Sequence, residues 1–266
     1  MIELGRHNVL GVLVNAVDYE AAVRCIVTAA LSRQGLAVSA VAVHGIMTGL
    51  LDAQQRYRLN GLDMVVPDGQ PVRWALKWLH QIQLPDRVYG PRLMVAICGD
   101  AARLGLPVFL YGSTDEILAR LCARLRRSFP ALSIVGAQSS KFRCLSAVEK
   151  DQLVRKIRNS GARVVLVGMG CPRQEVWAYE FREQLSIPLV AVGAAFSFLA
   201  GTSPQAPEWM QARGFEWLFR LASEPTRLWK RYILLNPLFL GSLLMQLAGL
   251  RFDSSGRKPR RDLLYG

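Results

Sequence analysis

The sequence predicts an α/β fold in which a mainly parallel sheet is covered by helices on both faces. Short apolar, β-branched runs alternate along the chain with segments of helical character. The run at residues 164–167 is typical of a strand buried on both faces, and it ends in Gly168 and Gly170. Regular alternation of this kind favours parallel strands joined by crossover helices.

Each expected strand is a short apolar run, and the expected helices lie between these runs. Strands are expected at residues 9–14, 38–43, 63–66, 107–111, 132–135, 164–167 and 188–192. Helices are expected at residues 18–34, 46–59, 72–79, 93–104, 115–128 and 147–159, with a further helix whose first turn contains Pro172. Asp18 can cap the first helix, and Ser113 or Thr114 can cap the helix that ends at Ser128.

Composition restricts the function. A formal net charge of +13 indicates an anionic partner, which could be a nucleic acid, a nucleotide or a lipid surface. The five cysteines are scattered and lack CxxC spacing, so we expect neither a disulfide framework nor a zinc site, and the reducing cytosol is the natural compartment. The N-terminal segment carries Glu3 and has no small-residue cleavage site, so no signal peptide is predicted.

The ends of the predicted strands provide candidate functional residues, because ligands of open α/β sheets bind beyond the carboxyl ends of the strands. These candidates are His44, Asp68, Gly112, Gly168, Gly170 and Gly193. Asp68 lies between Pro67 and Gly69, where a partly desolvated carboxylate can take a proton from a hydroxyl group. A turn or cap aspartate would give the same pattern at Asp68, and a structural histidine would give it at His44.

The segment after residue 167 reads GMGCPRQE and resembles an anion-binding turn. Glycines let a ligand approach the backbone, and the N-terminus of the following helix favours phosphate. An ordinary βα turn is the alternative. The full GxGxxG pattern is absent, which argues against a nicotinamide-dependent oxidoreductase. The basic residues cluster beside an apolar run and not with stacking aromatic residues, so nucleic-acid binding is not predicted.

The alternation stops after Gly201, which predicts two parts, a catalytic domain at residues 1–203 and a helical appendage at residues 204–266. Helices are expected at residues 208–221 and 225–235.

Residues 232–250 carry no charge over 19 positions, but Pro237 predicts a helix break that leaves only 14 residues to Leu250. Fourteen helical residues span about 21 Å, less than the roughly 30 Å of a bilayer core. Because cations flank both sides, we expect a basic, apolar helix pair in the membrane interface; a buried helix or a homo-oligomer contact is the alternative.

Three blocks carry a resemblance to a known family: VVPDG, VGMGCPRQEVW and EWLFRLASEPTRLWKRY. They resemble the signature blocks of the WecG/TagA/CpsF glycosyltransferases, glycosyltransferase family 26, over about residues 11–232. The resemblance implies a bacterial enzyme with a Rossmann-like core that uses neither a metal nor another cofactor. It implies inverting transfer of a sugar from a UDP-sugar donor to a polyprenyl-diphosphate-linked sugar acceptor. It also implies an appendage that binds the cytoplasmic face of the inner membrane and completes the active site.

The resemblance assigns roles to individual residues. Asp68 matches the proposed catalytic base, and His44 is added to the catalytic group as a strand-end residue. The nucleotide-sugar group consists of Gly112, Gly168, Gly170, Pro172, Gln174 and Glu175. The appendage arginines that meet the diphosphate match Arg220 and Arg227, with Lys230 or Arg231 next.

Two departures from the family concern the sugar. Many members carry Thr and Asn where this chain reads AVAVH at residues 40–44, and many carry Asp at the position of Ser197. The segment VHGIMTG resembles the corresponding segment of members that build exopolysaccharide, including xanthan-type glucosyltransferases. The sequence therefore leaves glucosyl and N-acetylmannosaminyl transfer open. A non-catalytic, nucleotide-binding, membrane-associated protein is the alternative to an enzyme.

Overall fold

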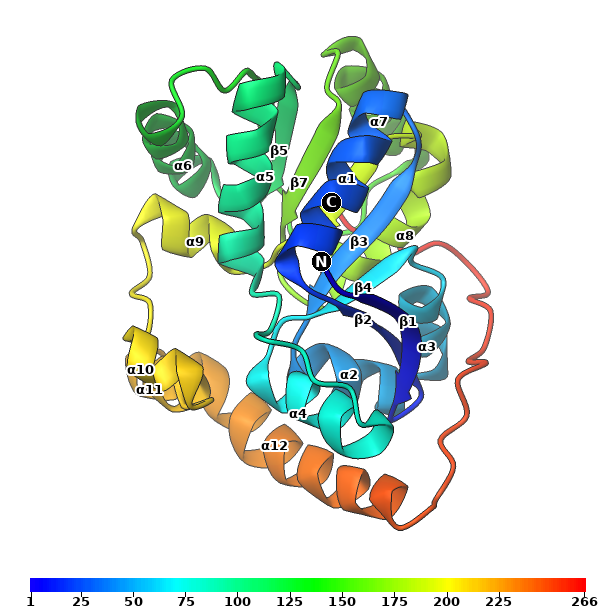
Figure 1. The fold of residues 1–266 in the computed structure, drawn as a ribbon. Helices are drawn as coiled ribbons and strands as arrows, with labels where there is room; N and C mark the ends of the chain where they lie inside the picture. Colours follow the sequence, from blue (N-terminus) through cyan, green and yellow to red (C-terminus); the bar gives the residue numbers. More distant parts are fainter.

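The computed structural model describes residues 1–266 and confirms the α/β fold with a parallel sheet. Six strands pair in the order β4-β3-β8-β7-β5-β6, and all their pairings are parallel. They are β3 (Leu36–Val41), β4 (Met64–Pro67), β5 (Val108–Gly112), β6 (Ile134–Gln138), β7 (Val164–Gly168) and β8 (Pro188–Ala191). Figure 1 shows this twisted sheet at the centre of the molecule. The order places β3/β4 and β5/β6 on opposite sides, with the last two strands between them.

Helices cover both faces of the sheet, as the alternation predicted (Figure 1). One face is covered by α1 (Tyr19–Ser32), α5 (Gly90–Leu104), α6 (Asp115–Ser128) and α9 (Ala195–Ala200). The other packs against α7 (Ala147–Asn159) and α8 (Arg173–Leu185), and this core continues into α2 (Val43–Leu51), α3 (Ala53–Asn60) and α4 (Gln70–His80). Within β7, Val164 and Leu166 belong to the first core and Val165 and Val167 to the second, because successive strand side chains point to opposite faces.

The prediction of one strand at residues 9–14 is wrong. These residues form the end of β1 (Glu3–Val9), a turn, and the start of β2 (Val12–Val17), which pair antiparallel in a separate two-stranded sheet. Leu10 and Gly11 have φ values of 53° and 87°, as a two-residue hairpin turn requires. The continuous apolar run concealed this turn, because Leu10 is itself fully buried.

Two predicted helices are interrupted. The helix expected at residues 46–59 is divided into α2 and α3 at Asp52, whose side chain accepts hydrogen bonds from Gln54 N (2.8 Å) and Gln55 N (3.3 Å). Competition by an aspartate side chain for backbone N–H groups favours a new helix start over continuation. The helix expected at residues 208–221 is divided into α10 (Glu208–Ala212) and α11 (Glu216–Ser223), with Gly214 at φ +77° between them.

The predicted helix caps are present, and one predicted helix start is shifted by one residue. Asp18 caps α1 and Thr114 caps α6, each accepting a hydrogen bond from a first-turn N–H. Pro172 was expected in the first turn of α8, but it lies directly before that helix, which begins at Arg173.

The helix break predicted at Pro237 is also wrong. Helix α12 runs without interruption from Pro225–Leu247, and Pro237 lies inside it. A proline in a helix interior removes one hydrogen bond and is unfavourable by about 3 kcal/mol or more. Burial of Phe239 and Leu243 against the body holds the following turns in place. No helix of the structure combines the length and apolarity that a membrane crossing needs.

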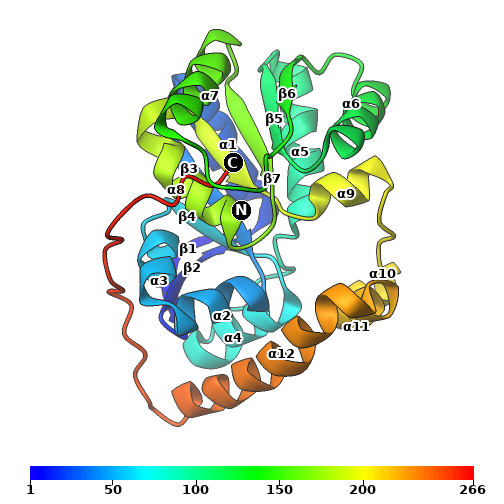
Figure 2. The ribbon, with the colours of Figure 1, turned by 180° about the vertical axis from the view of Figure 1, so that it is seen from behind.

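The chain returns to the α/β body after α12. Figures 1 and 2 show residues 251–266, drawn in red, running along the side of the body to its centre. Asn60 Nδ2 donates to Ser254 O (2.7 Å), and the carboxylate of Glu180 accepts from Leu263 N and Leu264 N (2.9 Å each). Glu180 also pairs with Arg58 at 3.4 Å, and both side chains are almost fully buried. One buried carboxylate on α8 therefore holds both α3 and the C-terminal segment.

This arrangement predicts a large cost for removing Glu180. Glu180→Ala is expected to lower the free energy of unfolding by about 3–5 kcal/mol, because a buried Arg58 guanidinium is left without its acid. Urea unfolding measures the change. Glu183→Ala is the matched control on the same helix, since the Glu183 side chain is 83% exposed. Its ion pair with Arg182 is expected to contribute less than about 1 kcal/mol. Equal losses in the two variants would contradict the role of the buried pair.

Candidate active site

A cavity of about 700 Å³ opens beyond the carboxyl ends of the sheet strands. Segments that follow β3, β4, β5, β7 and β8 form one side, and α11 and α12 form the other. Figure 2 shows α12 crossing this end of the body beside α2 and α4. The residues proposed from sequence that line the cavity are His44, Asp68, Gly168, Gly170, Gln174, Glu175, Gly193, Arg220, Arg227 and Arg231. Gly112, Pro172 and Lys230 are not among its lining residues.

Asp68 lies directly after β4, at the edge where the strands end. Its Oδ1 accepts a hydrogen bond from Gly90 N at 2.9 Å, the first residue of α5. Burial raises the pKa of Asp68 to about 6; the nearby Arg87 acts in the opposite direction and Glu216 in the same direction. The carboxylate is thus ionised near neutral pH and holds a proton more readily than an exposed aspartate. These are the properties of a general base.

His44 is the second residue of α2 and faces the same cavity. Burial, together with repulsion from Arg231, lowers the pKa of His44 to about 3. Its Nδ1 is buried and has no hydrogen-bond partner within the chain. The imidazole is therefore neutral at physiological pH and can exchange a hydrogen bond with a bound ligand, but it supplies no positive charge.

The two glycines after β7 differ in their surroundings. A Cβ atom on Gly168 would lie 2.4 Å from Cγ of Phe196, so this glycine lets the strand end pack against α9. Gly170 has φ +81°, and a Cβ atom there would meet nothing within 4 Å. Gly170 is the position where the backbone is open to the cavity.

Gln174 and Glu175 are buried, and their side chains stabilise the turn after β7 through hydrogen bonds. Gly170 N donates to Gln174 Oε1 (3.1 Å), and Gln174 Nε2 donates to Glu175 Oε1 (2.9 Å). Ser39 Oγ on β3 donates to the same oxygen at 3.0 Å. Burial raises the pKa of Glu175, and its Oε2 has no hydrogen-bond partner within the chain. The pair links the turn to β3 as well as facing the cavity.

The three sequence-proposed residues outside the lining have other surroundings. Gly112, at φ +112°, would place a Cβ atom 2.8 Å from the backbone of Gly168, so it allows β5 and β7 to end side by side. Pro172 precedes α8. Lys230 is exposed, with its Nζ 5.6 Å from the ring centroid of Trp229. It therefore faces away from the cavity that Arg231 enters.

Three arginines from α11 and α12 enter the cavity. The Nε atoms of Arg220 and Arg231 are buried without a hydrogen-bond partner in the chain, whereas Arg227 pairs with Glu224. Burial lowers the pKa of Arg231, and the charges of Arg220 and Arg227 act in the same direction. Mutually repelling guanidinium groups with unused N–H donors are suited to an anion with several oxygen acceptors.

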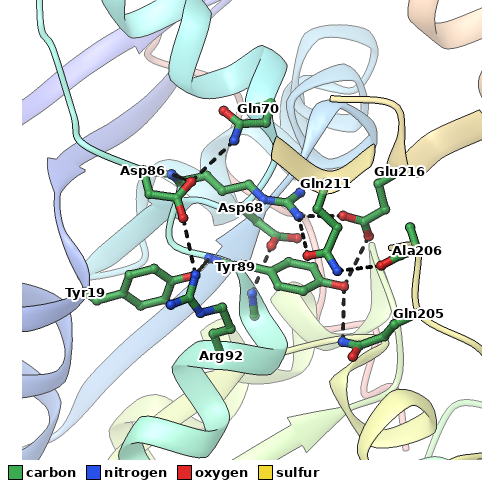
Figure 3. Close-up of polar contacts among 12 residues, drawn as sticks. Tyr19, Asp68, Gln70, Asp86, Tyr89, Arg92, Gln205, Ala206, Gln211 and Glu216 are labelled. Atoms are coloured by element: carbon green, nitrogen blue, oxygen red, sulfur yellow. Dashed lines mark hydrogen bonds and ion pairs between the residues drawn. The ribbon is translucent and has the colours of Figure 1, made fainter. Parts of the chain in front are cut away.

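A second group of side chains connects α11 to Asp68, and sequence reasoning did not find it. Arg87 Nη2 donates to Glu216 Oε2 at 2.6 Å, and Tyr89 Oη donates to Glu216 Oε1 at 3.3 Å (Figure 3). Arg87 is only 6% exposed. No local pattern distinguishes it from the other arginines, because its partner lies 129 positions away. No group of three or more His, Cys, Asp or Glu side chains is placed to hold a metal ion.

The chain matches the Glycosyl transferase WecG/TagA/CpsF family over residues 7–252, and it therefore belongs to that family. The match confirms the resemblance predicted from the three sequence blocks. Members of the family are glycosyltransferases of cell-surface polysaccharide synthesis. All residues that line the cavity fall within the matched range, including those from α11 and α12.

Proposed function

We propose that this member of the WecG/TagA/CpsF family is an inverting, metal-independent glycosyltransferase. Its donor is a UDP-sugar, and its acceptor is a sugar carried on a polyprenyl diphosphate. The observation that carries the proposal is that a partly buried carboxylate, Asp68, and three arginines line one cavity at the carboxyl ends of the sheet. A carboxylate can take the acceptor proton, and arginines can stabilise the leaving diphosphate.

The donor diphosphate is proposed to bind between the open turn at Gly170 and the arginines of α11 and α12. Gly170 leaves room for close approach, and Arg220 and Arg231 have buried N–H groups that lack acceptors in the chain. Charge-assisted hydrogen bonds to a phosphate would satisfy them. As UDP leaves, negative charge grows on its terminal phosphate oxygen, and guanidinium groups already in place stabilise that charge.

The transfer step is a single displacement. A hydroxyl oxygen of the acceptor attacks the anomeric carbon while the bond from that carbon to the diphosphate oxygen breaks. The electron pair of that bond leaves with UDP, and the hydroxyl proton passes to Asp68. One displacement inverts the anomeric configuration. Neutral His44 can hold the acceptor or the donor sugar by a hydrogen bond from the same side of the cavity.

The sugar itself is not assigned by these contacts. Residues 40–44 and Ser197, where this chain departs from many members, all line the cavity. They are therefore placed to affect which sugar is accepted. A panel of UDP-sugars, including UDP-glucose and UDP-N-acetylmannosamine, with a lipid-diphosphate-sugar acceptor tests the proposal. Acceptor-dependent release of UDP is expected with one donor, whereas nucleotide binding without release would favour the non-catalytic alternative.

Asp68→Asn is expected to lower kcat by roughly 10²–10⁴-fold, because the base is lost. UDP affinity should change little. In the wild type, kcat/KM is expected to rise with pH through about pH 6 and to level off above it, since the base works only when deprotonated. We call this rise the acid limb of the profile, and Asp68→Asn should lack it. Asp100→Asn is the control, because Asp100 lies near the end of α5 that is farther from Asp68 and does not line the cavity. Wild-type turnover in a folded Asp68→Asn protein would overturn the assignment.

Arg231→Ala is expected to weaken UDP binding by about ten- to a hundredfold, the usual effect of losing a charge-assisted hydrogen bond. Its free energy of unfolding should not fall, because the Nε atom of Arg231 is buried without a hydrogen-bond partner and the side chain forms no ion pair in the chain. Calorimetry with UDP and urea unfolding measure the two effects. Lys230→Ala removes a neighbouring charge outside the cavity and is expected to change UDP affinity less than about twofold. Equal losses for Arg231→Ala and Lys230→Ala would contradict the proposed diphosphate site.

The appendage at residues 204–266 is proposed to rest on the cytoplasmic surface of the inner membrane. Large apolar side chains are exposed along α11 and α12, among them Trp217, Leu218, Trp229, Ile233, Leu234, Leu238, Leu240 and Leu244. Lysine and arginine residues precede and follow this surface. Apolar side chains beside cations are suited to an anionic lipid interface. The acceptor would then reach the cavity from the bilayer that holds its polyprenyl chain.

Replacing Leu234 and Leu244 together by glutamine is expected to weaken binding to anionic vesicles at least about tenfold. Both side chains are more than 60% exposed, so UDP affinity and stability should be retained. Val148→Gln, at an exposed apolar position on α7, is the control. Vesicle flotation measures binding, and size-exclusion chromatography reports oligomeric state. If the double change dissociates a dimer and leaves flotation unaltered, this surface is an oligomer contact.

A further inference from the structure

The contact between Glu216 and the segment 87–90 joins the C-terminal helices to the side of the cavity that holds Asp68. Glu216 lies in the first turn of α11. Both of its carboxylate oxygens are engaged, one by Arg87 and the other by Tyr89. Figure 3 shows Glu216 and Tyr89 directed toward one another, with Asp68 close by. The contact thus joins two elements far apart in the sequence.

The segment 87–90 is also tied to the end of β4. Val88 N donates to Pro67 O at 2.8 Å, and Gly90 N donates to Asp68 Oδ1 at 2.9 Å. Two residues of this short segment therefore contact the β4 end, and the two residues alternating with them contact α11. A displacement of Arg87 or Tyr89 would be transmitted through one or two peptide units to the hydrogen bond on Asp68.

Arg87 is held by contacts with the C-terminal helices and with its neighbour Tyr89. Besides Glu216, its Nη2 donates to Gln211 Oε1 on α10 at 3.2 Å, and its guanidinium carbon lies 4.2 Å from the ring centroid of Tyr89. The side chains of the ion pair are 8% and 13% exposed. A buried ion pair is weak evidence for added stability, because removing both charges from water offsets much of their attraction. Its place beside Asp68 suggests a role in the site.

Titratable and charged side chains surround Asp68 from three elements, and the tyrosines among them are neutral. Arg87 and Tyr89 come from the segment before α5, Glu216 and Arg220 from α11, and Tyr19 from α1. The positive charges of Arg87 and Arg220 lower the pKa of Asp68, and the negative charge of Glu216 raises it. Without Glu216, Arg87 would act on the carboxylate unopposed.

We propose that Glu216 is a positioning residue for the transfer reaction. By holding Arg87 and Tyr89 it orients the segment 87–90 against Asp68, and by balancing the charge of Arg87 it preserves the basicity of Asp68. The packing of α11 against the body thereby affects the orientation and the proton affinity of Asp68. This inference rests on the proposed function, in which Asp68 takes the acceptor proton.

The coupling predicts opposite effects for the two members of the ion pair. Glu216→Gln keeps the size of the side chain and removes its charge, so the acid limb of kcat/KM should move to lower pH than in the wild type. Arg87→Gln leaves Glu216 unopposed, so the limb should move to higher pH. In the double variant neither charge remains, and the limb should return toward its wild-type position. Each single variant should also lose roughly ten- to a hundredfold in kcat, because the segment beside the base is displaced.

Control variants separate this effect from a general loss of structure. Glu208→Gln removes an exposed acid from α10 and should leave both the limb and kcat unchanged. Glu216→Asp keeps the charge on a shorter side chain, so kcat should fall while the limb stays near its wild-type position. Glu216→Asp also provides the test if Glu216→Gln does not fold. UDP affinity, measured by calorimetry, should be retained in both Glu216 variants.

The experiment compares pH profiles of all variants with the wild type and Asp68→Asn in one transfer assay. If the wild type transfers no sugar, or Asp68→Asn retains activity and the limb, the proposed function fails. If those two behave as expected but Glu216→Gln and Arg87→Gln shift the limb in the same direction or not at all, this inference alone is overturned. Opposite shifts that cancel in the double variant support it.

Discussion

Two arginines that line the cavity, Arg220 and Arg231, form no ion pair within the chain, whereas Arg87 and Arg227 pair with Glu216 and Glu224. Their Nε atoms are buried and have no acceptor in the chain, and the charges of Arg220 and Arg227 repel that of Arg231. Burying unpartnered cations is unfavourable for folding, so the arrangement has to be held by contacts elsewhere. An anionic ligand would relieve the repulsion. A site with unpaired cations favours a highly charged anion, and the proposed diphosphate donor is such an anion.

Contacts at the far end of α12 help to hold the arginines of this helix in place. Phe239 and Leu243 are buried in the core on one face of the sheet. Gln246 accepts a hydrogen bond from Leu10 N (2.9 Å) and donates to Asn8 O (3.0 Å), both in the β1–β2 hairpin. The hairpin lies outside the main sheet, and this contact gives it a clear structural role. It anchors one end of the helix whose other end brings Arg227 and Arg231 to the cavity.

The opposite side of the cavity depends on the order of strands. Because β3/β4 and β5/β6 are separated by β7 and β8, the loops after β3, β4, β7 and β8 surround a common space. The end of β4 places Asp68 there. Burial raises the pKa of Asp68, and the hydrogen bond from Gly90 N lowers it. Arg87 and Glu216 then connect this side to α11. Asp68, the turn after β7 and the arginines therefore line one cavity only when the C-terminal helices are packed on the sheet.

The sequence by itself determined the features that depend on neighbouring residues. The alternation of apolar runs and helical segments, the caps at Asp18 and Thr114, and Asp68 at a strand end all follow from local periodicity and turn chemistry. Specific blocks at residues 65–69, 167–177 and 216–232 likewise indicated the family, which the match over residues 7–252 confirms. Tertiary structure decided the rest. Leu10 and Gly11 form a hairpin turn, α12 continues through Pro237, and Arg87 finds Glu216 129 positions away. Each of these depends on packing or on charges brought together from distant segments, and the energies of such contacts exceed or add to the local preferences that a sequence displays.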